Sequence, residues 1–119
     1  MTRVLIVDDQ PAFRRQLRAL LASAGLEVIG EADDIATAET LAQFLQPDLA
    51  IVDVLLPGVS GIEGTPRLQA LAPKMRVILV SAYHERLLHA SAQAVGAEAF
   101  IPKDELDLSV ALSWNKKRR

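Results

Sequence analysis

The chain has 119 residues, enough for one domain with a single hydrophobic core. Hydrophobic residues make up 50% of it, charged residues 24%, and the net charge is -2, which fits a globular protein and points to no polyanionic partner. The absence of cysteine excludes disulfides, thiolate chemistry and cysteine-ligated metal centres. The amino terminus reads as neither a signal peptide nor a membrane span, so we expect a cytoplasmic protein with no membrane partner.

Five short hydrophobic runs, rich in β-branched residues, predict five strands. They lie at residues 4–7, 27–30, 49–52, 77–80 and 99–101. Segments between them carry apolar residues at helical spacing, which predicts amphipathic helices. The first helix should begin at Gln10-Pro11 and end at Gly25, and Asp33 or Asp34 can cap the second. In the third crossover, Thr65-Pro66 should shift the start of the helix or bend it.

The regular alternation of strand and helix predicts the α/β class. Parallel strands joined by right-handed crossovers would form a doubly wound five-stranded sheet with helices on both faces. The runs at residues 5–7, 50–52 and 77–80 are continuously apolar, as strands buried on both faces require. In such sheets the reactive site lies at the carboxyl ends of the strands. The polar residues that follow the strands are therefore the candidates for function.

The C-terminal segment fits two periodicities. Leu106, Val110 and Trp114 match one helical stripe, although the apolar residues there also alternate with period two. We favour a short helix, in which Leu108 and Leu112 would face another side and leave apolar surface for a partner. The domain should cover residues 1–115, and we interpret the basic residues 116–119 as a solvated tail or truncated linker.

Three aspartates follow predicted strands. Asp8 and Asp9 come directly after the first strand, and Asp53 comes after the third. Because the carboxyl ends of parallel strands meet at one edge, these carboxylates should converge, and like charges so close together favour a hard cation. Oxygen ligands of this kind suit Mg²⁺, which leaves room for a phosphate oxygen. Asp8 and Asp9 alone could form a turn or a helix cap, but Asp53 after a second buried strand argues against that.

Two polar residues end the remaining strands on the same side. Ser81 follows the fourth run, and Lys103 comes shortly after the fifth. A hydroxyl and an ammonium are donors where the carboxylates are acceptors, so together they could grip a phosphoryl group on Asp53. Individually, Ser81 could cap the next helix and Lys103 could be a surface charge. Their joint placement is what favours a site.

Together these residues resemble the receiver domain of bacterial response regulators. The resemblance rests on Asp8-Asp9, the segment 53–58 (DVLLPG), Ser81-Ala82 and Pro102-Lys103, and it covers essentially the whole chain. It implies a flavodoxin-like sheet of order 2-1-3-4-5. It also implies a signalling domain of a two-component system rather than an enzyme, with no reaction beyond its own phosphorylation and dephosphorylation.

The resemblance implies a role for each matching residue. Asp53 would be the phosphoacceptor, attacking the phosphorus of a phosphohistidine on a sensor histidine kinase or of a small phosphodonor. Mg²⁺ would bind the side chains of Asp9 and Asp53 and the backbone carbonyl of Leu55 directly, with Asp8 acting mainly through bound water. Such a transfer depends mainly on positioning and charge neutralisation.

Further positions would convert phosphorylation into a signal. By the resemblance, Ser81 and Lys103 move onto the phosphoryl group, and Phe100 turns inward as Ser81 shifts. The alternative is that Phe100 is simply a core residue. Leu55 and Tyr83 lie where side chains flank the incoming water, so their bulk should slow hydrolysis of the phosphoryl group.

By analogy, the expected output is transcription. Pro102-Lys103-Asp104 replaces the commoner Lys-Pro order and resembles receivers that precede helix-turn-helix effectors, so we expect a missing DNA-binding effector and no direct nucleic-acid contact by this domain. A stand-alone receiver is the alternative. Phosphorylated receivers commonly form homodimers through the fourth helix, fifth strand and fifth helix, which here would involve Leu87, Leu88, Phe100 and Trp114.

Other function classes fit less well. An aspartate-nucleophile phosphohydrolase would need aspartates two positions apart and a cap insertion, whereas Asp8 and Asp9 are adjacent. A flavin module would need phosphate-binding donors in the acidic loop at 8–11. A docking module not regulated by phosphorylation stays an alternative, although every required side chain is present. His84 and His89 are five apart with no acidic pair nearby in the sequence, so we expect no histidine metal site.

Overall fold

The structure is a computed structural model that describes residues 1–84 and 86–115. Its strands are β1 (Arg3–Val7), β2 (Glu27–Ala32), β3 (Leu49–Asp53), β4 (Arg76–Ser81) and β5 (Ala99–Pro102). Its helices are α1 (Pro11–Ser23), α2 (Ile35–Leu45), α3 (Gly61–Leu71), α4 (Arg86–Ala94), the short 3-10 helix η1 (Lys103–Glu105) and α5 (Leu108–Ser113). Every predicted strand is present, with one or two residues added at its ends.

The strands form one sheet in the order β2-β1-β3-β4-β5, and all of its pairs are parallel. The predicted flavodoxin-like topology is therefore confirmed. Within the ladder, Val7 pairs with Val52 and Ser81 pairs with Pro102. The residues that follow β1, β3, β4 and β5 consequently meet at one edge of the sheet, as the sequence predicted.

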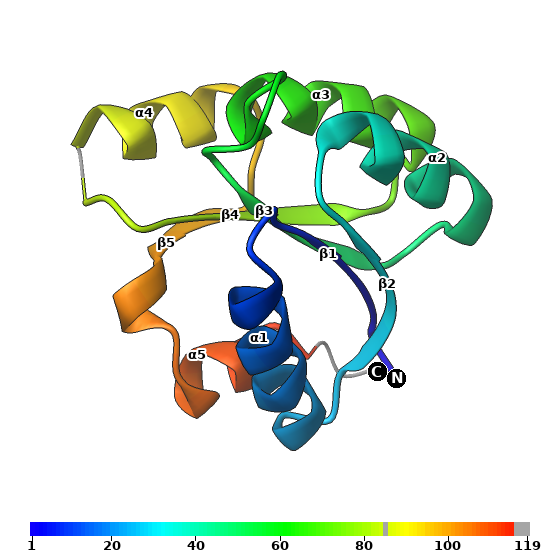
Figure 1. Cartoon of the computed structure of the whole chain (residues 1–119), viewed down its shortest axis with the longest axis vertical. Coiled ribbons are helices and arrows are strands. Elements are labelled where there is room, and N and C mark those ends of the chain that lie inside the picture. Colours follow the sequence, from blue (N-terminus) through cyan, green and yellow to red (C-terminus); the bar gives the residue numbers. More distant parts are fainter. Residues whose placement is uncertain (85, 116–119) are drawn as a thin grey trace.

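Side chains that alternate across the sheet fill two hydrophobic cores. Leu5 and Val7 of β1 pack on the side of α2, α3 and α4, whereas Val4 and Ile6 pack on the side of α1 and α5. Figure 1 shows these two groups of helices on opposite faces of the sheet. β3 and β4 alternate in the same way, so the central strands are buried on both sides and hold their carboxyl ends firmly in place.

Local sequence sets the boundaries of the first two helices. α1 begins at Pro11, because proline lacks the N–H that a first helical turn leaves unpaired. The chain leaves α1 through Gly25 at φ +80°, a left-handed conformation that favours glycine. Asp34, one of the two predicted caps, accepts the N–H of Thr37 at 2.8 Å and closes the first turn of α2.

The first residue of α3 lies against the backbone of the segment after β3. The Gly61 N–H donates to the Val54 carbonyl at 2.9 Å, and a side chain at Gly61 would overlap the Asp53 carbonyl oxygen. A capping box at Ser60 sets this helix start. Pro66 lies inside the helix, so the helix begins ahead of this proline, and the Thr65 hydroxyl donates to the Gly61 carbonyl at 2.8 Å.

The predicted C-terminal helix is present as α5, with Asp107 as its cap. Leu108 and Leu112 are 44% and 50% exposed, as predicted. Trp114 is only 3% exposed and packs in the core on the α1 side of the sheet. Its predicted place on an interaction surface is therefore wrong, because the stripe at Leu106 and Trp114 is the one that packs inward. The basic residues 116–119 lie outside the described residues.

Membrane crossing would require a long apolar helix. Among the residues that the structure describes, none of the helices has both the length and the apolar character that a membrane span needs.

The contact at Gly61 makes a prediction about stability. Gly61→Ala should lower the free energy of unfolding by roughly 1–3 kcal/mol, because the added Cβ meets backbone that cannot rotate away. Urea denaturation followed by circular dichroism would measure the loss. Gly30→Ala is the matched control, since its Cβ would meet a leucine methyl at 3.2 Å that can shift. Equal stability of the Gly61→Ala variant and the parent chain would contradict this account of the α3 start.

Candidate functional site

Three aspartates meet at the carboxyl edge of the sheet. Asp53 is the last residue of β3 and is 5% exposed, and Asp8 follows β1 and is 1% exposed. Asp9, the next residue, is exposed. One carboxylate oxygen of each lies within 4.8 Å of the others. The predicted convergence of the three carboxylates is therefore present, and parallel pairing of β1 with β3 explains it.

The Lys103 ammonium sits against two of these carboxylates. Its Nζ atom lies 2.8 Å from Asp8 Oδ2 and 3.0 Å from Asp53 Oδ2. It also lies 3.5 Å from Gln10 Oε1 and 4.1 Å from the centroid of the Phe13 ring. Lys103 comes directly after β5, the outermost strand beside β4. Because all the strands are parallel, the carboxyl end of β5 lies on the same side as those of β1 and β3, which brings the Lys103 ammonium to the aspartates.

The charges in this cluster do not balance. Burial raises the pKa of Asp53 above its ordinary value, with Asp8 adding to the effect, while hydrogen bonds from Lys103 and the Leu55 N–H oppose it. Burial works against the Lys103 ammonium, yet the Asp8 and Asp53 carboxylates outweigh burial and raise the pKa of Lys103. Lys103 therefore stays charged, whereas buried Asp53 carries its charge at a cost.

Backbone groups hold the carboxylates in position. The Gln10 N–H donates to Asp8 Oδ1 at 2.8 Å, and the Leu55 N–H donates to Asp53 Oδ1 at 3.0 Å. In both aspartates this leaves Oδ2 turned toward the Lys103 ammonium. Each carboxylate therefore has one oxygen tied to its own turn and one oxygen aimed into the shared site.

The residues of this cluster fit a divalent cation. Asp8 Oδ2 is buried and receives no well-aligned hydrogen bond from the described residues, although it is in ionic contact with Lys103. Three carboxylates against one ammonium leave excess negative charge, which a hard cation with oxygen ligands would neutralise. The donor set consists of oxygens alone, which is the preference of Mg²⁺.

Of the other predicted site residues, Leu55 bonds to this cluster through its N–H on Asp53, whereas no hydrogen bond to it is found for Ser81, Tyr83 or Phe100 among the described residues. The hydroxyl of Ser81, fully buried at the end of β4, accepts the Tyr83 N–H at 3.1 Å. The ring of Phe100 is 8% exposed and lies edge-on to His89, with centroids 4.4 Å apart. Leu55 and Tyr83 are 54% and 55% exposed. Phe100 is therefore largely buried and packs in the core on the α4 side of the sheet.

A second group of titratable side chains consists of His84, Asp104 and Glu105. His84 Nε2 lies 2.9 Å from a carboxylate oxygen of Asp104, and its Nδ1 lies 3.7 Å from Glu105. The sequence offers no acidic pair close to His84, and the fold supplies one because η1 lies beside the loop after β4. All three side chains are exposed, and His89 takes no part in the group.

Sequence reasoning missed three residues that shape the site. The Arg14 guanidinium donates to the Asp8 carbonyl at 2.6 Å and to Glu31 at 2.9 Å, which ties the loop after β1 to β2. Gln10 and Phe13 contact the Lys103 ammonium. The available signal was the start of α1 at Gln10-Pro11, which places Phe13 and Arg14 in the first turn above the acidic edge.

Comparisons with known proteins agree with the fold. The sequence matches the response regulator receiver domain family over residues 4–111. A putative transcriptional regulator of Pseudomonas aeruginosa is 36% identical over 105 residues, which are 88% of this chain and 51% of that protein. Chemotaxis protein CheY of Thermotoga maritima is 32% identical over 114 residues, 96% of this chain and 95% of that protein.

A solved structure of a receiver domain has the same fold. The signal receiver domain of the putative response regulator NarL from Mycobacterium tuberculosis has a TM-score of 0.86 and 32% identity, covering 95% of this chain and 91% of that chain. The α/β sheet and its acidic edge thus define a signalling domain of two-component systems. The chain belongs to the response regulator receiver domain family. It spans about half the length of the first transcriptional regulators that it matches.

The raised pKa of Asp53 makes a prediction about pH. The folded chain favours the neutral carboxyl, so ionisation of Asp53 destabilises the fold above the unfolded pKa of about 4. Asp53→Asn should therefore be more stable than the parent at neutral pH. The difference should vanish where the carboxyl is protonated in both states and should grow as pH rises through the folded pKa.

Urea unfolding of both chains in metal-free buffer, from about pH 3 to about pH 8, would measure this difference. Asp33→Asn is the control, because Asp33 is exposed and outside the cluster. An Asp53→Asn variant that is less stable than the parent at neutral pH would show that the ion pair with Lys103 outweighs the burial of the carboxylate.

Proposed function

We propose that this chain is a phosphoacceptor receiver in which Asp53 takes a phosphoryl group from a sensor histidine kinase. The observation that carries the proposal is the buried Asp53 carboxylate, flanked by Asp8 and Asp9 and held by the Lys103 ammonium at 3.0 Å. Family membership supports the same reading. The location that we expect is the cytoplasm.

The proposed reaction moves one phosphoryl group. An oxygen of Asp53 forms a bond to phosphorus as the bond from phosphorus to the kinase histidine nitrogen breaks, and that nitrogen keeps the electron pair. Mg²⁺ held by Asp8, Asp9, Asp53 and the Leu55 carbonyl would neutralise charge on the phosphoryl oxygens. Lys103 already lies beside Asp53 Oδ2 and can donate to the group that arrives there.

The aspartyl phosphate would add charge of about -1.5 to -2 to the edge of the sheet. We propose that the Ser81 hydroxyl then exchanges the Tyr83 N–H for a phosphoryl oxygen, and that Phe100 follows as the switch residue. The surface of α4, β5 and α5 would carry the signal to an output, for which Leu87, 76% exposed, is a better contact than buried Phe100 or Trp114. A homodimer through this surface belongs to the same proposal.

The proposed output is transcription through a DNA-binding effector. Relatives described as transcriptional regulators, of which this chain spans about half, support that assignment. We also propose that the receiver covers residues 1–115, with the basic residues 116–119 as a tail or linker outside it. We propose no direct contact of the receiver itself with DNA and no chemistry beyond its own phosphorylation and dephosphorylation.

Intact-mass spectrometry would test the acceptor. After incubation with Mg²⁺ and acetyl phosphate, the parent should gain one phosphoryl group and Asp53→Asn should gain none. Asp9→Asn should slow the gain at limiting Mg²⁺, because a carboxylate oxygen of Asp9 lies in the cation cluster. A parent that stays unmodified while a control receiver is labelled would favour the docking module that is not regulated by phosphorylation.

Leu55 makes a separate prediction about the lifetime of the phosphoryl group. Its side chain is 54% exposed beside the acceptor, so Leu55→Ala should open a path for water and speed hydrolysis about threefold to tenfold. Loss of the phosphoryl mass after removal of the donor would measure the rate. Leu108→Ala, at a similarly exposed position on α5, should leave the rate unchanged. An unchanged rate in Leu55→Ala would remove Leu55 from this role.

A further inference from the structure

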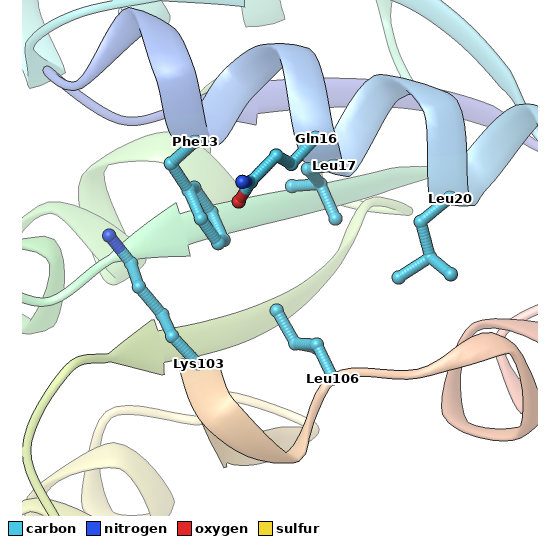
Figure 2. A pocket seen from close by; sticks show the side chains of 6 residues that line it. All are labelled: Phe13, Gln16, Leu17, Leu20, Lys103 and Leu106. Carbon is cyan, nitrogen blue, oxygen red and sulfur yellow. The ribbon is translucent and has the colours of Figure 1, made fainter.

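The Lys103 ammonium has neutral partners as well as charged ones. Asp8 and Asp53 lie at 2.8 and 3.0 Å, whereas Gln10 Oε1 lies at 3.5 Å and the Phe13 ring centroid at 4.1 Å. Figure 2 shows Lys103 and Phe13 reaching toward each other across a groove, one from the segment after β5 and the other from α1. An ammonium has three N–H donors, so two carboxylates leave one direction for the neutral partners.

We propose that Phe13 is a positioning residue: the face of its ring holds the Lys103 ammonium in place for phosphoryl transfer to Asp53. The inference rests on the proposed function. The Lys103 side chain is 14% exposed and Phe13 is half-buried, so water shields the contact only partly. A cation over an aromatic face is held more strongly in such a setting than at an open surface.

The charged partners alone do not keep Lys103 in one place. A cation that binds Asp8, Asp9 and Asp53 would compete with the Lys103 ammonium for the same carboxylates, and it would also repel the ammonium. The Phe13 ring is not a metal ligand, so its attraction for the ammonium persists when the carboxylates are engaged elsewhere.

The groove beside the lysine gives its stem room to move. A cavity of about 200 Å³ is lined by Phe13, Gln16, Leu17, Leu20, Lys103 and Leu106. Figure 2 shows the leucines along this groove and the Phe13 ring beside the tip of Lys103. The aliphatic stem is therefore not enclosed by packing on this side, and the ring is the wall that meets the ammonium.

Two substitutions separate ring electrostatics from packing. Phe13→Leu keeps an apolar side chain in the groove but removes the aromatic face, and Phe13→Tyr keeps the face. Phosphorylation of the parent and both variants by acetyl phosphate at saturating Mg²⁺ should be about threefold slower in Phe13→Leu and close to the parent in Phe13→Tyr. Leu20→Met, in the same groove but away from the ammonium, should match the parent.

A double-mutant cycle makes the test specific to Lys103. In a Lys103→Met background the ammonium is gone, so Phe13→Leu should have no further effect on the rate. A similar loss in both backgrounds would overturn the proposal and assign Phe13 to packing alone. An unchanged rate in Phe13→Leu with Lys103 present would also overturn it.

A readout that needs no phosphorylation keeps this proposal separate from the proposed function. The ring current of Phe13 should displace the NMR signals of the Lys103 ε-methylene protons, with Mg²⁺ present as well as absent. The displacement should disappear in Phe13→Leu and persist in Phe13→Tyr. If the parent takes up no phosphoryl group but the displacement is present, the proposed function fails while the contact stands. A displacement that Mg²⁺ abolishes would refute the positioning role.

Discussion

Excess negative charge at the carboxyl edge of the sheet is the constraint on which the rest of this structure depends. Asp8 and Asp53 are nearly inaccessible to water, and Lys103 is the cation between them in the described chain. Burial of two carboxylates is tolerated only with compensating groups at short range. One ammonium supplies part of that compensation, and the N–H groups of Gln10 and Leu55 supply more. The remaining negative charge favours a cation, so the fold keeps a destabilising cluster of carboxylates at this edge.

The hydrophobic layers explain why the edge can carry this cost. β1, β3 and β4 are buried on both faces, and their alternating side chains fill two cores that no single substitution at the edge removes. Each large side chain buried there contributes roughly 1.5–3 kcal/mol, so several of them together offset one poorly neutralised carboxylate, which costs on the order of several kcal/mol. The contact of α3 with the Asp53 carbonyl fixes the end of β3 from a second direction. The rigid strands therefore hold the carboxylates closer together than their mutual repulsion would allow in a flexible chain.

Short-range sequence patterns predicted the strands and the residues that follow them. Features that depend on tertiary packing were not predicted correctly. Apolar runs of strand length gave the sheet, and parallel order brought Asp8, Asp9 and Asp53 together. Trp114 was assigned to a surface because its helical stripe could face either way until the packing of α5 was known. The His84 contact with Asp104 joins residues twenty apart in the sequence, so no local sequence pattern predicts it. The contact of Phe13 with Lys103 was not predicted either, because an apolar residue in a first helical turn usually packs in the core.

The two loops that flank the site are linked to each other outside it. His84 lies three residues after Ser81, and Asp104 directly follows Lys103, so the contact of His84 with Asp104 at 2.9 Å joins the segments that carry the proposed phosphate ligands. Because Asp104 adjoins Lys103 in the chain, the contact places η1 directly beside the loop after β4. The contact is exposed, and exposed pairs are worth little on their own. The contact therefore shows that the fold brings the two loops together, and it adds little stability of its own.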